Sequence, residues 1–142
     1  MSIRPGKILL TLSAIGQVAG PFIFDFNETH VKNPRWPPHA RFHNGQTMSM
    51  GVCLALATTY YTWRRSSNAL VAKDSLKTAM IFGSVYWVTG LSAILYPGTK
   101  WVDPEFGDGH PQLFIFVPLL LCATVGYLIE TTFYIGDSKK RD

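Results

Sequence analysis

Residues 113–133 read LFIFVPLLLCATVGYLIETTF, and this apolar run decides the class of fold. A helix rises about 1.5 Å per residue, so crossing the hydrocarbon core of a bilayer takes roughly 20 residues. Three further runs of similar length flank it, at residues 8–26, 46–63 and 76–96. The run at 46–63 is the weakest because it carries four threonines and a serine. The pattern predicts an all-α integral membrane four-helix bundle.

The alternative is a soluble four-helix bundle. The runs lack the polar stripe that a soluble amphipathic helix shows every three to four residues, and glycine and proline recur inside them, as membrane helices tolerate. A chain of 142 residues is also too short to cover so much apolar surface with its own polar elements. We therefore expect residues 1–142 to form a single four-span transmembrane domain.

Orientation follows from lysine and arginine, which are enriched in short cytoplasmic loops. One side of the predicted bundle holds most of them: Arg4, Lys7, Arg64, Arg65, Lys73, Lys77, Lys139, Lys140 and Arg141. The other side holds Lys32, Arg35, Arg41 and Lys100. This bias predicts cytoplasmic termini, with two structured loops, residues 27–45 and 97–112, on the non-cytoplasmic face. We expect a multi-pass protein of the endoplasmic reticulum membrane.

The topology accounts for the net charge of +4, and anionic lipid headgroups are its expected counter-charge. No basic surface with interleaved aromatic residues is present in the sequence, which argues against a nucleic-acid partner.

Two features inside the predicted spans concern packing. Glu130 is the most costly polar group there, and we expect it to reach outward toward Lys73 or Lys77. Gly16 and Gly20 form a face of small residues that lets another helix approach closely. That helix belongs either to the same chain or to a second copy, so a homo-oligomer stays open.

The predicted functional site lies in the first non-cytoplasmic loop. Residues 28–44 read ETHVKNPRWPPHARFHN and hold His30, His39 and His43, while the remaining histidine, His110, lies in the second loop on the same side. Loops this long and this rich in proline exceed what joining two antiparallel helices requires. We interpret them as a cap over the helix ends.

Asp25 and Glu28 are the candidate acids. If the first helix continues through them, their three-residue spacing places both carboxyl groups on one face. Two such groups acquire different pKa values, so that one holds a proton while the other stays ionised, as acid/base catalysis uses. The other interpretation is that Asp25 only marks the boundary between membrane and water.

His39 and His43 raise the question of a metal. Their spacing puts both imidazoles on one face if the segment is helical, and Pro37 and Pro38 suit a helix start. With Glu28 or His30 they would complete a zinc site. However, Arg41 lies between them and would repel a cation. We favour a metal-free hydrogen-bond network that includes Arg41, and we expect no cofactor.

Four residues are candidates for binding a substrate. Trp36 either lines an apolar pocket or anchors the loop among headgroups. Asn44 is expected to cap the N-terminus of the second helix, whose dipole would stabilise an oxyanion. Pro118 is expected to kink the fourth helix and open room for a lipophilic molecule near Tyr86 and Trp87.

The run ETHVKNPRWPPHARFHN resembles the signature of a family of small four-span membrane proteins found in fungi and bacteria. The resemblance covers this loop and, beyond it, only the pattern of spans. It singles out Glu28, His30, His39, Arg41, His43 and Asn44.

The chain is also similar in size to membrane enzymes of fungal natural-product clusters that open epoxides or cyclise polyketide and terpenoid chains, as in aurovertin-like pathways. Its architecture resembles the sterol-isomerase group, which has four spans, an acidic residue ending helix one and a pocket open to the membrane, although the sequence motifs differ. These resemblances imply secondary-metabolite biosynthesis or double-bond isomerisation.

Together these observations predict a cofactor-independent membrane enzyme. Glu28 or Asp25 would activate water or remove a proton from a lipophilic, epoxide-like substrate, and a histidine with Arg41 would protonate or stabilise the leaving oxygen. The alternatives are a double-bond isomerase and a non-catalytic protein that binds lipid or a partner.

Overall fold

The computed structural model describes residues 4–135, which form four long helices and no strand. They are α1 (Pro5–Phe24), α2 (Pro38–Trp63), α3 (Ala69–Ser92) and α4 (Pro111–Ile129). Short helical turns extend two of them, η1 (Ala93–Leu95) after α3 and the π-helical η3 (Glu130–Ile135) after α4, while η2 (Pro104–Phe106) lies in the connection between. The all-α prediction is confirmed. Lys139, Lys140 and Arg141 lie outside the described residues.

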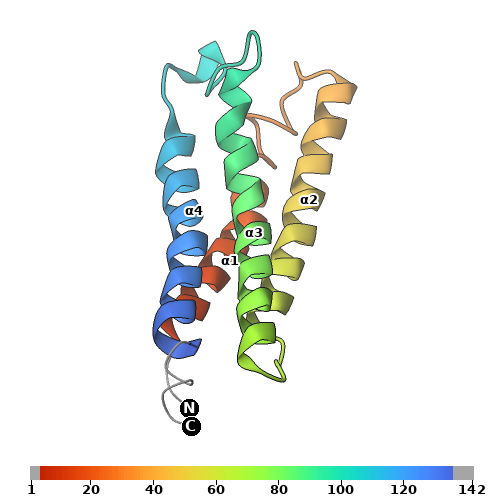
Figure 1. Ribbon diagram of the computed structural model, residues 1–142. Coiled ribbons are helices and arrows are strands. Elements are labelled where there is room, and N and C mark those ends of the chain that lie inside the picture. Colours follow the sequence, from red (N-terminus) through yellow and green to blue (C-terminus); the bar gives the residue numbers. More distant parts are fainter. Residues whose placement is uncertain (1–3, 136–142) are drawn as a thin grey trace.

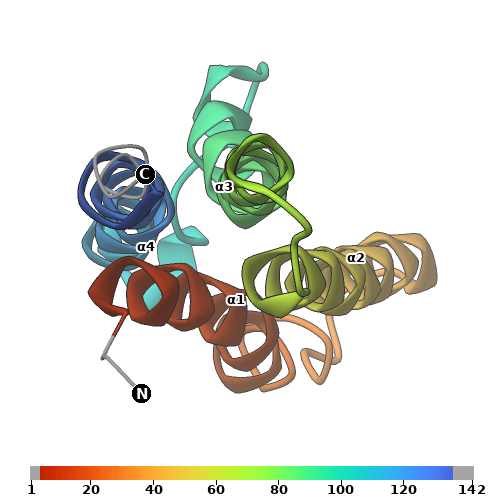
Figure 2. The ribbon, with the colours of Figure 1, turned by 60° about the horizontal axis from the view of Figure 1, so that its bottom comes forward.

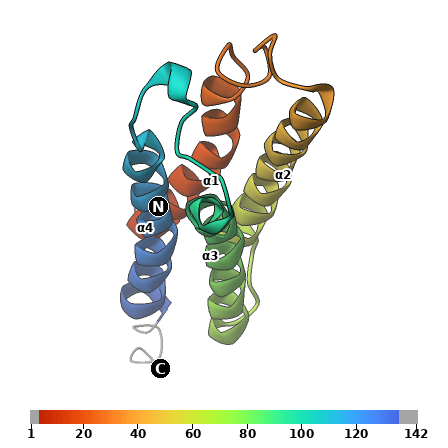
Figure 3. The same cartoon turned by 90° about the horizontal axis from the view of Figure 1, so that it is seen from above.

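The helices run alternately up and down (Figure 1). α1 packs against α2 and α4, and α3 packs against the same two helices from the opposite side. The end view in Figure 2 shows the resulting ring. The connections α1–α2 and α3–α4 lie at one end of the bundle, as predicted for the two loops (Figure 3).

Among the described residues, three helical segments are long and apolar enough to cross a membrane: Pro5–Phe24, Ala69–Leu95 and Pro111–Ile135. α2 is not one of them, although its 26 residues exceed the length that a span needs. Its threonines and its polar first turns lower its hydropathy. The span predicted at 46–63 is thus helical throughout but remains a prediction as a membrane crossing.

Proline decides where α2 begins. Pro38 is the first residue of the helix, where its fixed φ is helical and its missing N–H costs nothing. The helix starts about two turns earlier than the apolar run indicates. The expectation that Asn44 caps it was therefore wrong, because Asn44 lies inside the helix.

The α1–α4 contact depends on glycine. A Cβ at Gly6 would lie 2.3 Å from the carbonyl oxygen of Gly126, and a Cβ at Gly126 would lie 2.7 Å from that of Gly6. The two backbones therefore touch at this point. Gly16 leaves space for the side chains of Leu119 and Trp87, whereas a Cβ at Gly20 would meet no described atom within 4 Å. The predicted face of Gly16 and Gly20 is only half used for packing.

Glu130 joins the end of α4 to the start of α1. Its side chain is fully buried, and its carboxylate accepts a hydrogen bond from Arg4 Nε at 2.7 Å, a second from the Arg4 terminal nitrogen, and one from the Lys7 backbone N–H at 3.2 Å. The expected partners Lys73 and Lys77 were wrong. They lie on α3, while Arg4 precedes α1 and faces the end of α4.

Candidate functional site

Asp25 ends α1. Its N–H donates to the Pro21 carbonyl at 2.9 Å, and the N–H of Phe26 donates to the same oxygen at 3.2 Å. The chain then turns back, so that the Val31 N–H donates to the Asp25 carbonyl at 3.1 Å. Because the helix does not continue, Glu28 does not share a face with Asp25, and the Glu28 side chain is exposed. The predicted carboxylate pair was wrong.

Asp25 instead lies among residues from three other segments. Burial, the largest effect, raises the pKa of its carboxyl group above the usual value of 3.8. Positive charge at His30 and a hydrogen bond from the Asn44 side chain oppose this shift. Asp25 also interacts electrostatically with Tyr86, which is buried on α3. We call Asp25, His30, Asn44 and Tyr86 the Asp25 cluster.

The sequence pointed to all four members of this cluster, but in different roles. Asp25 and His30 were predicted to be catalytic, whereas Asn44 and Tyr86 were predicted to bind substrate. The structure brings them together because α2 and α3 both pass the end of α1 at the level where the first loop folds back. Among the described residues no direct ion pair joins Asp25 to His30, so their interaction acts at longer range.

Local hydrogen bonds orient the His30 ring. The Asn27 amide donates to the carbonyls of Ile23 and Phe24 at 3.1 and 2.9 Å, which turns its oxygen toward Thr29. That oxygen accepts from the Thr29 backbone N–H at 2.8 Å and from its hydroxyl at 2.6 Å. Because the hydroxyl proton is used there, Nδ1 of His30, 2.7 Å from the same hydroxyl, acts as the donor. Nε2 of neutral His30 then carries the free lone pair.

Trp36 fixes the other side of the ring. Its indole meets the His30 imidazole edge to face, with 5.0 Å between ring centroids. Trp36 is half-buried, and its ring contact with His30 links it to the cluster. Asn27 and Thr29 were not among the predicted site residues, although an Asn-x-Thr sequence after an apolar helix indicates a turn of this kind.

His39 and His43 form a separate pair on the first turns of α2. Their Nε2 atoms lie 3.0 Å apart, both side chains are exposed, and the exposed ring of Phe42 packs against each. The prediction that these imidazoles share a helical face is confirmed. Within residues 4–135 no group of three metal-binding side chains occurs. No hydrogen bond or ring contact joins the pair to the Asp25 cluster in that range.

Arg41 ties the loops together. Its guanidinium donates to the carbonyl of Asn33 at 2.6 Å, and the Asn33 amide donates to Glu105 at 3.1 Å. Arg35 forms an ion pair with the same carboxylate. Asn33 is only 3 % exposed and is the centre of this network, which the sequence did not indicate. Arg41 is thereby placed in the loop framework, away from direct contact with Asp25 among the described residues.

Trp87 belongs to the core beneath the cluster. It is 1 % exposed, and its Nε1 donates to the Ser13 hydroxyl at 2.8 Å. Its ring packs edge to face on Tyr86. It also packs against Phe116, which lies on α4 two residues before Pro118. The structure thus places Trp87 behind Tyr86, where it fixes the position of that ring.

A buried amide lies one layer below Tyr86. The Gln17 Nε2 donates to the Phe82 carbonyl at 2.8 Å, but its buried Oε1 has no hydrogen-bond partner among the described residues. A Cβ at Gly51 would lie 2.3 Å from the Gln17 carbonyl oxygen and 3.4 Å from the Tyr86 ring. Gly51 therefore lets α2 approach α1 closely at this level.

An apolar groove runs between α1 and α2 on the outside of the bundle. It has a volume of about 380 Å³ and is lined by side chains such as Ile15, Val18, Val52 and Leu56. Along α1, Val18 precedes Asp25 by seven residues, which is about two helical turns. The groove therefore ends about two helical turns below Asp25 and includes no residue of the Asp25 cluster.

Residues 9–141 match DUF6640, described as a family of unknown function. The chain belongs to the DUF6640 family. The match includes α2, α3, α4, all of α1 but its first four residues, and every residue of the Asp25 cluster of this DUF6640 protein. No curated protein and no solved structure matches the chain.

Proposed function

We propose that the protein is a multi-pass membrane enzyme that uses Asp25 and His30 as an acid/base pair on a lipophilic substrate, and that the reaction is the opening of an epoxide. The observation that carries the proposal is the placement of Asp25 at the end of a candidate membrane span, half-buried and beside a histidine whose tautomer is fixed. Elevated pKa values of buried carboxyl groups are typical of catalytic acids.

Asp25 is suited to be the acid. Burial raises its pKa, so the protonated form is more populated at a given pH than in a free aspartate. A protonated carboxyl group at the boundary of the membrane supplies a proton to an oxygen without placing a full charge in an apolar environment. The Asn44 amide then stabilises the carboxylate that remains.

His30 is suited to be the base. Its Nδ1–H is held by Thr29, which leaves Nε2 to accept a proton. The orienting contact of the Trp36 ring restricts rotation of the imidazole. This division of roles differs from the sequence-based hypothesis, in which a carboxylate was the base and a histidine the acid.

The reaction balances with water as the only co-reactant. Asp25 donates its proton to the epoxide oxygen as one carbon–oxygen bond breaks. A water molecule forms a new bond to that carbon and gives its proton to His30 Nε2. Transfer of this proton back to Asp25, directly or through solvent, restores both groups and leaves a diol. In a cyclising reaction a hydroxyl group of the substrate replaces the water.

Two further observations support a lipophilic substrate. The apolar groove between α1 and α2 lies on the outer surface of the bundle and is lined almost entirely by apolar side chains. The similarity in size to small membrane enzymes that open epoxides supports the same substrate class. Such a groove lets an apolar chain remain in the membrane while its reactive end meets the cluster.

The test uses the full chain in detergent with methyl epoxystearate in isotopically labelled water. We expect diol that carries the label, and we expect Asp25→Asn to lower the turnover by about 10²- to 10⁴-fold, the range for loss of a general acid. His30→Gln is expected to have an effect of similar size. Product is measured by mass spectrometry.

Glu28→Gln is the matched control. Like Asp25→Asn, it replaces a carboxyl group by an amide, but Glu28 is exposed and lies three residues away from Asp25. It should keep the wild-type rate. Equal losses in both carboxyl variants would contradict the assignment of Asp25. An unlabelled product of unchanged mass would reject hydrolysis in favour of isomerisation, and saturable binding without any product would identify a lipid-binding protein instead of an enzyme.

A further inference from the structure

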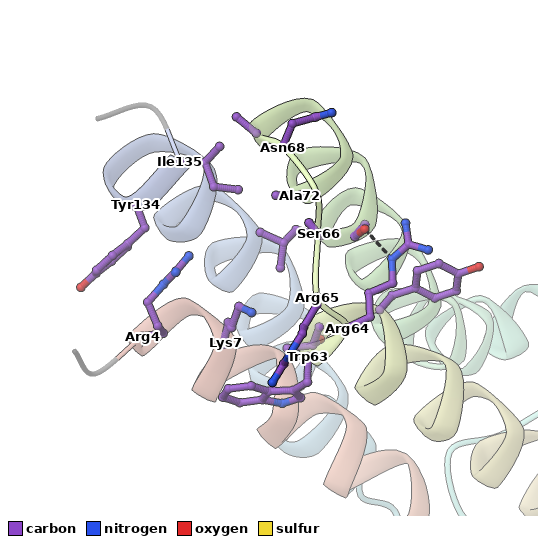
Figure 4. Close-up of a pocket in the computed structure, with 15 residues that line it drawn as sticks. Arg4, Lys7, Trp63, Arg64, Arg65, Ser66, Asn68, Ala72, Tyr134 and Ile135 are labelled. Carbon is purple, nitrogen blue, oxygen red and sulfur yellow. Dashed lines mark hydrogen bonds between the residues drawn. The ribbon is translucent and has the colours of Figure 1, made fainter. Parts of the chain in front are cut away.

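A second pocket lies at the opposite end of the bundle, where α1 begins and α4 ends. It has a volume of about 380 Å³, within the range of small-molecule sites. Figure 4 shows its side chains around one opening: Arg4 and Lys7 on the α1 side, Tyr134 and Ile135 at the end of η3, and Ser66 and Asn68 on the connection between α2 and α3. We call it the basic pocket.

The charge of this pocket is one-sided. Four cationic side chains line it, Arg4, Lys7, Arg64 and Arg65, and no acidic residue does so among the described residues. Glu130 is buried and does not line the pocket, and its carboxylate is already bound by Arg4.

The other three cations lack carboxylate partners in residues 4–135. Lys7 Nζ lies 5.1 Å from the centre of the Trp63 ring. Arg64 donates from Nε to the Ser75 hydroxyl at 2.7 Å and lies over the Tyr61 ring. Arg65 is exposed. These contacts orient the side chains without neutralising them, so the pocket keeps an excess of positive charge.

The remaining lining suits a molecule with one charged end. Ser66 and Asn68 add hydrogen-bond donors, and the Asn68 amide is free to donate because only its oxygen is used, as acceptor from the Val71 N–H at 3.0 Å. Tyr61, Trp63, Leu76 and Ile135 supply apolar walls. The pocket also lies at the ends of candidate spans, where lipid headgroups would meet water if these helices cross a membrane.

We propose that the basic pocket binds the phosphate group of a phosphorylated amphiphile, by preference a phosphomonoester. A phosphomonoester carries about −1.5 to −2 charges near neutral pH and several acceptor oxygens, which suits a pocket lined by cations from separate segments. A carboxylate would leave more of the positive charge uncompensated. The site is independent of the chemistry proposed at Asp25.

Three probes test whether the phosphate belongs to a membrane lipid or to a soluble compound. The purified full chain in detergent is titrated with dioctanoyl phosphatidic acid, with glycerol phosphate and with dioctanoyl phosphatidylcholine. We expect saturable binding of phosphatidic acid and little binding of the zwitterionic lipid. Competition by glycerol phosphate would show that the phosphate alone is recognised, as a soluble phosphorylated compound would present it. Binding of the lipid alone would assign the site to a membrane headgroup.

Arg65→Gln and Lys7→Gln are the test variants, and each should weaken binding of phosphatidic acid about tenfold, as expected for loss of one charge-assisted hydrogen bond. Arg65 is exposed, so this variant is not expected to disturb the fold. Lys73→Gln is the control, since Lys73 is an exposed cation near the same end of α3 but does not line the pocket. An equal loss in the control, equal binding of phosphatidylcholine, or no saturable binding would overturn the proposal.

Discussion

Two carboxyl groups lie at opposite ends of this bundle in contrasting environments. Glu130 is fully buried, yet it receives two hydrogen bonds from the Arg4 guanidinium and one from a backbone N–H. Asp25 is only half-buried, and its carboxyl group has no ion pair among the described residues; His30 acts on it at longer range and the Asn44 side chain favours its charged form. The more deeply buried acid is therefore the one whose charge is compensated.

The comparison shows that the role of a carboxyl group depends on whether a cation compensates its burial. A buried carboxylate with an arginine partner joins two segments of the chain, because removing either group leaves a charge without compensation. A carboxyl group that loses water without gaining such a partner has a raised pKa and exchanges its proton more readily near neutral pH. Asp25 is of the second kind.

The largest expected effect comes from breaking the compensated site. Arg4→Ala leaves Glu130 buried without its cation and should lower the free energy of unfolding by about 3 kcal/mol, as loss of one partner of a buried pair does. Thermal or denaturant unfolding in detergent measures this. Lys73→Ala removes an exposed cation as a control. If the two variants are equally stable, Arg4 does not compensate Glu130.

A smaller effect, of opposite sign, is expected at Asp25. Because its pKa is raised in the folded protein above 3.8, the protonated form stabilises the fold, and this contribution is lost as the pH rises through the folded-state pKa. Asp25→Asn keeps the shape but cannot ionise. It should therefore be more stable than the wild type at about pH 8, with the difference disappearing as the pH falls below the unfolded-state pKa of 3.8. Unfolding temperatures measured across this interval that differ by a constant amount would refute the assignment.

The smallest effect is expected at the exposed ion pair between the two loops. The Arg35 side chain is 71 % exposed, so water screens its attraction to Glu105. Arg35→Gln should lower stability by less than about 1 kcal/mol in the same unfolding assay. A loss of stability as large as that of Arg4→Ala would mean that the exposed ion pair contributes as much to stability as the buried one.

Much of the fold follows from the sequence. The four apolar runs became the four helices, and antiparallel connection of successive helices places both histidine-containing loops at one end. Helix boundaries were less predictable. Pro38 starts α2 well before its apolar run, and Asn27 with Thr29 turns the chain back after Asp25. Both signals are local, so a closer weighting of proline and of Asn-x-Thr turns would have found them.

Contacts between helices were the unpredictable part. Nothing in a single sequence states that α1 lies beside α4, so Lys73 and Lys77 were as reasonable partners for Glu130 as Arg4 was. The same is true of the candidate site. Asp25, Asn44 and Tyr86 lie on three different helices, and their meeting depends on how α1, α2 and α3 are rotated about their axes.

The contact between Arg4 and Glu130 joins residues 126 positions apart in the chain. During synthesis α1 emerges long before Glu130, so Arg4 lacks its carboxylate partner until the end of α4 has been made. The bundle closes only when the last helix arrives and the Gly6 and Gly126 backbones meet. A chain that stops before Gly126 would therefore lack both contacts that hold the start of α1 against the end of α4.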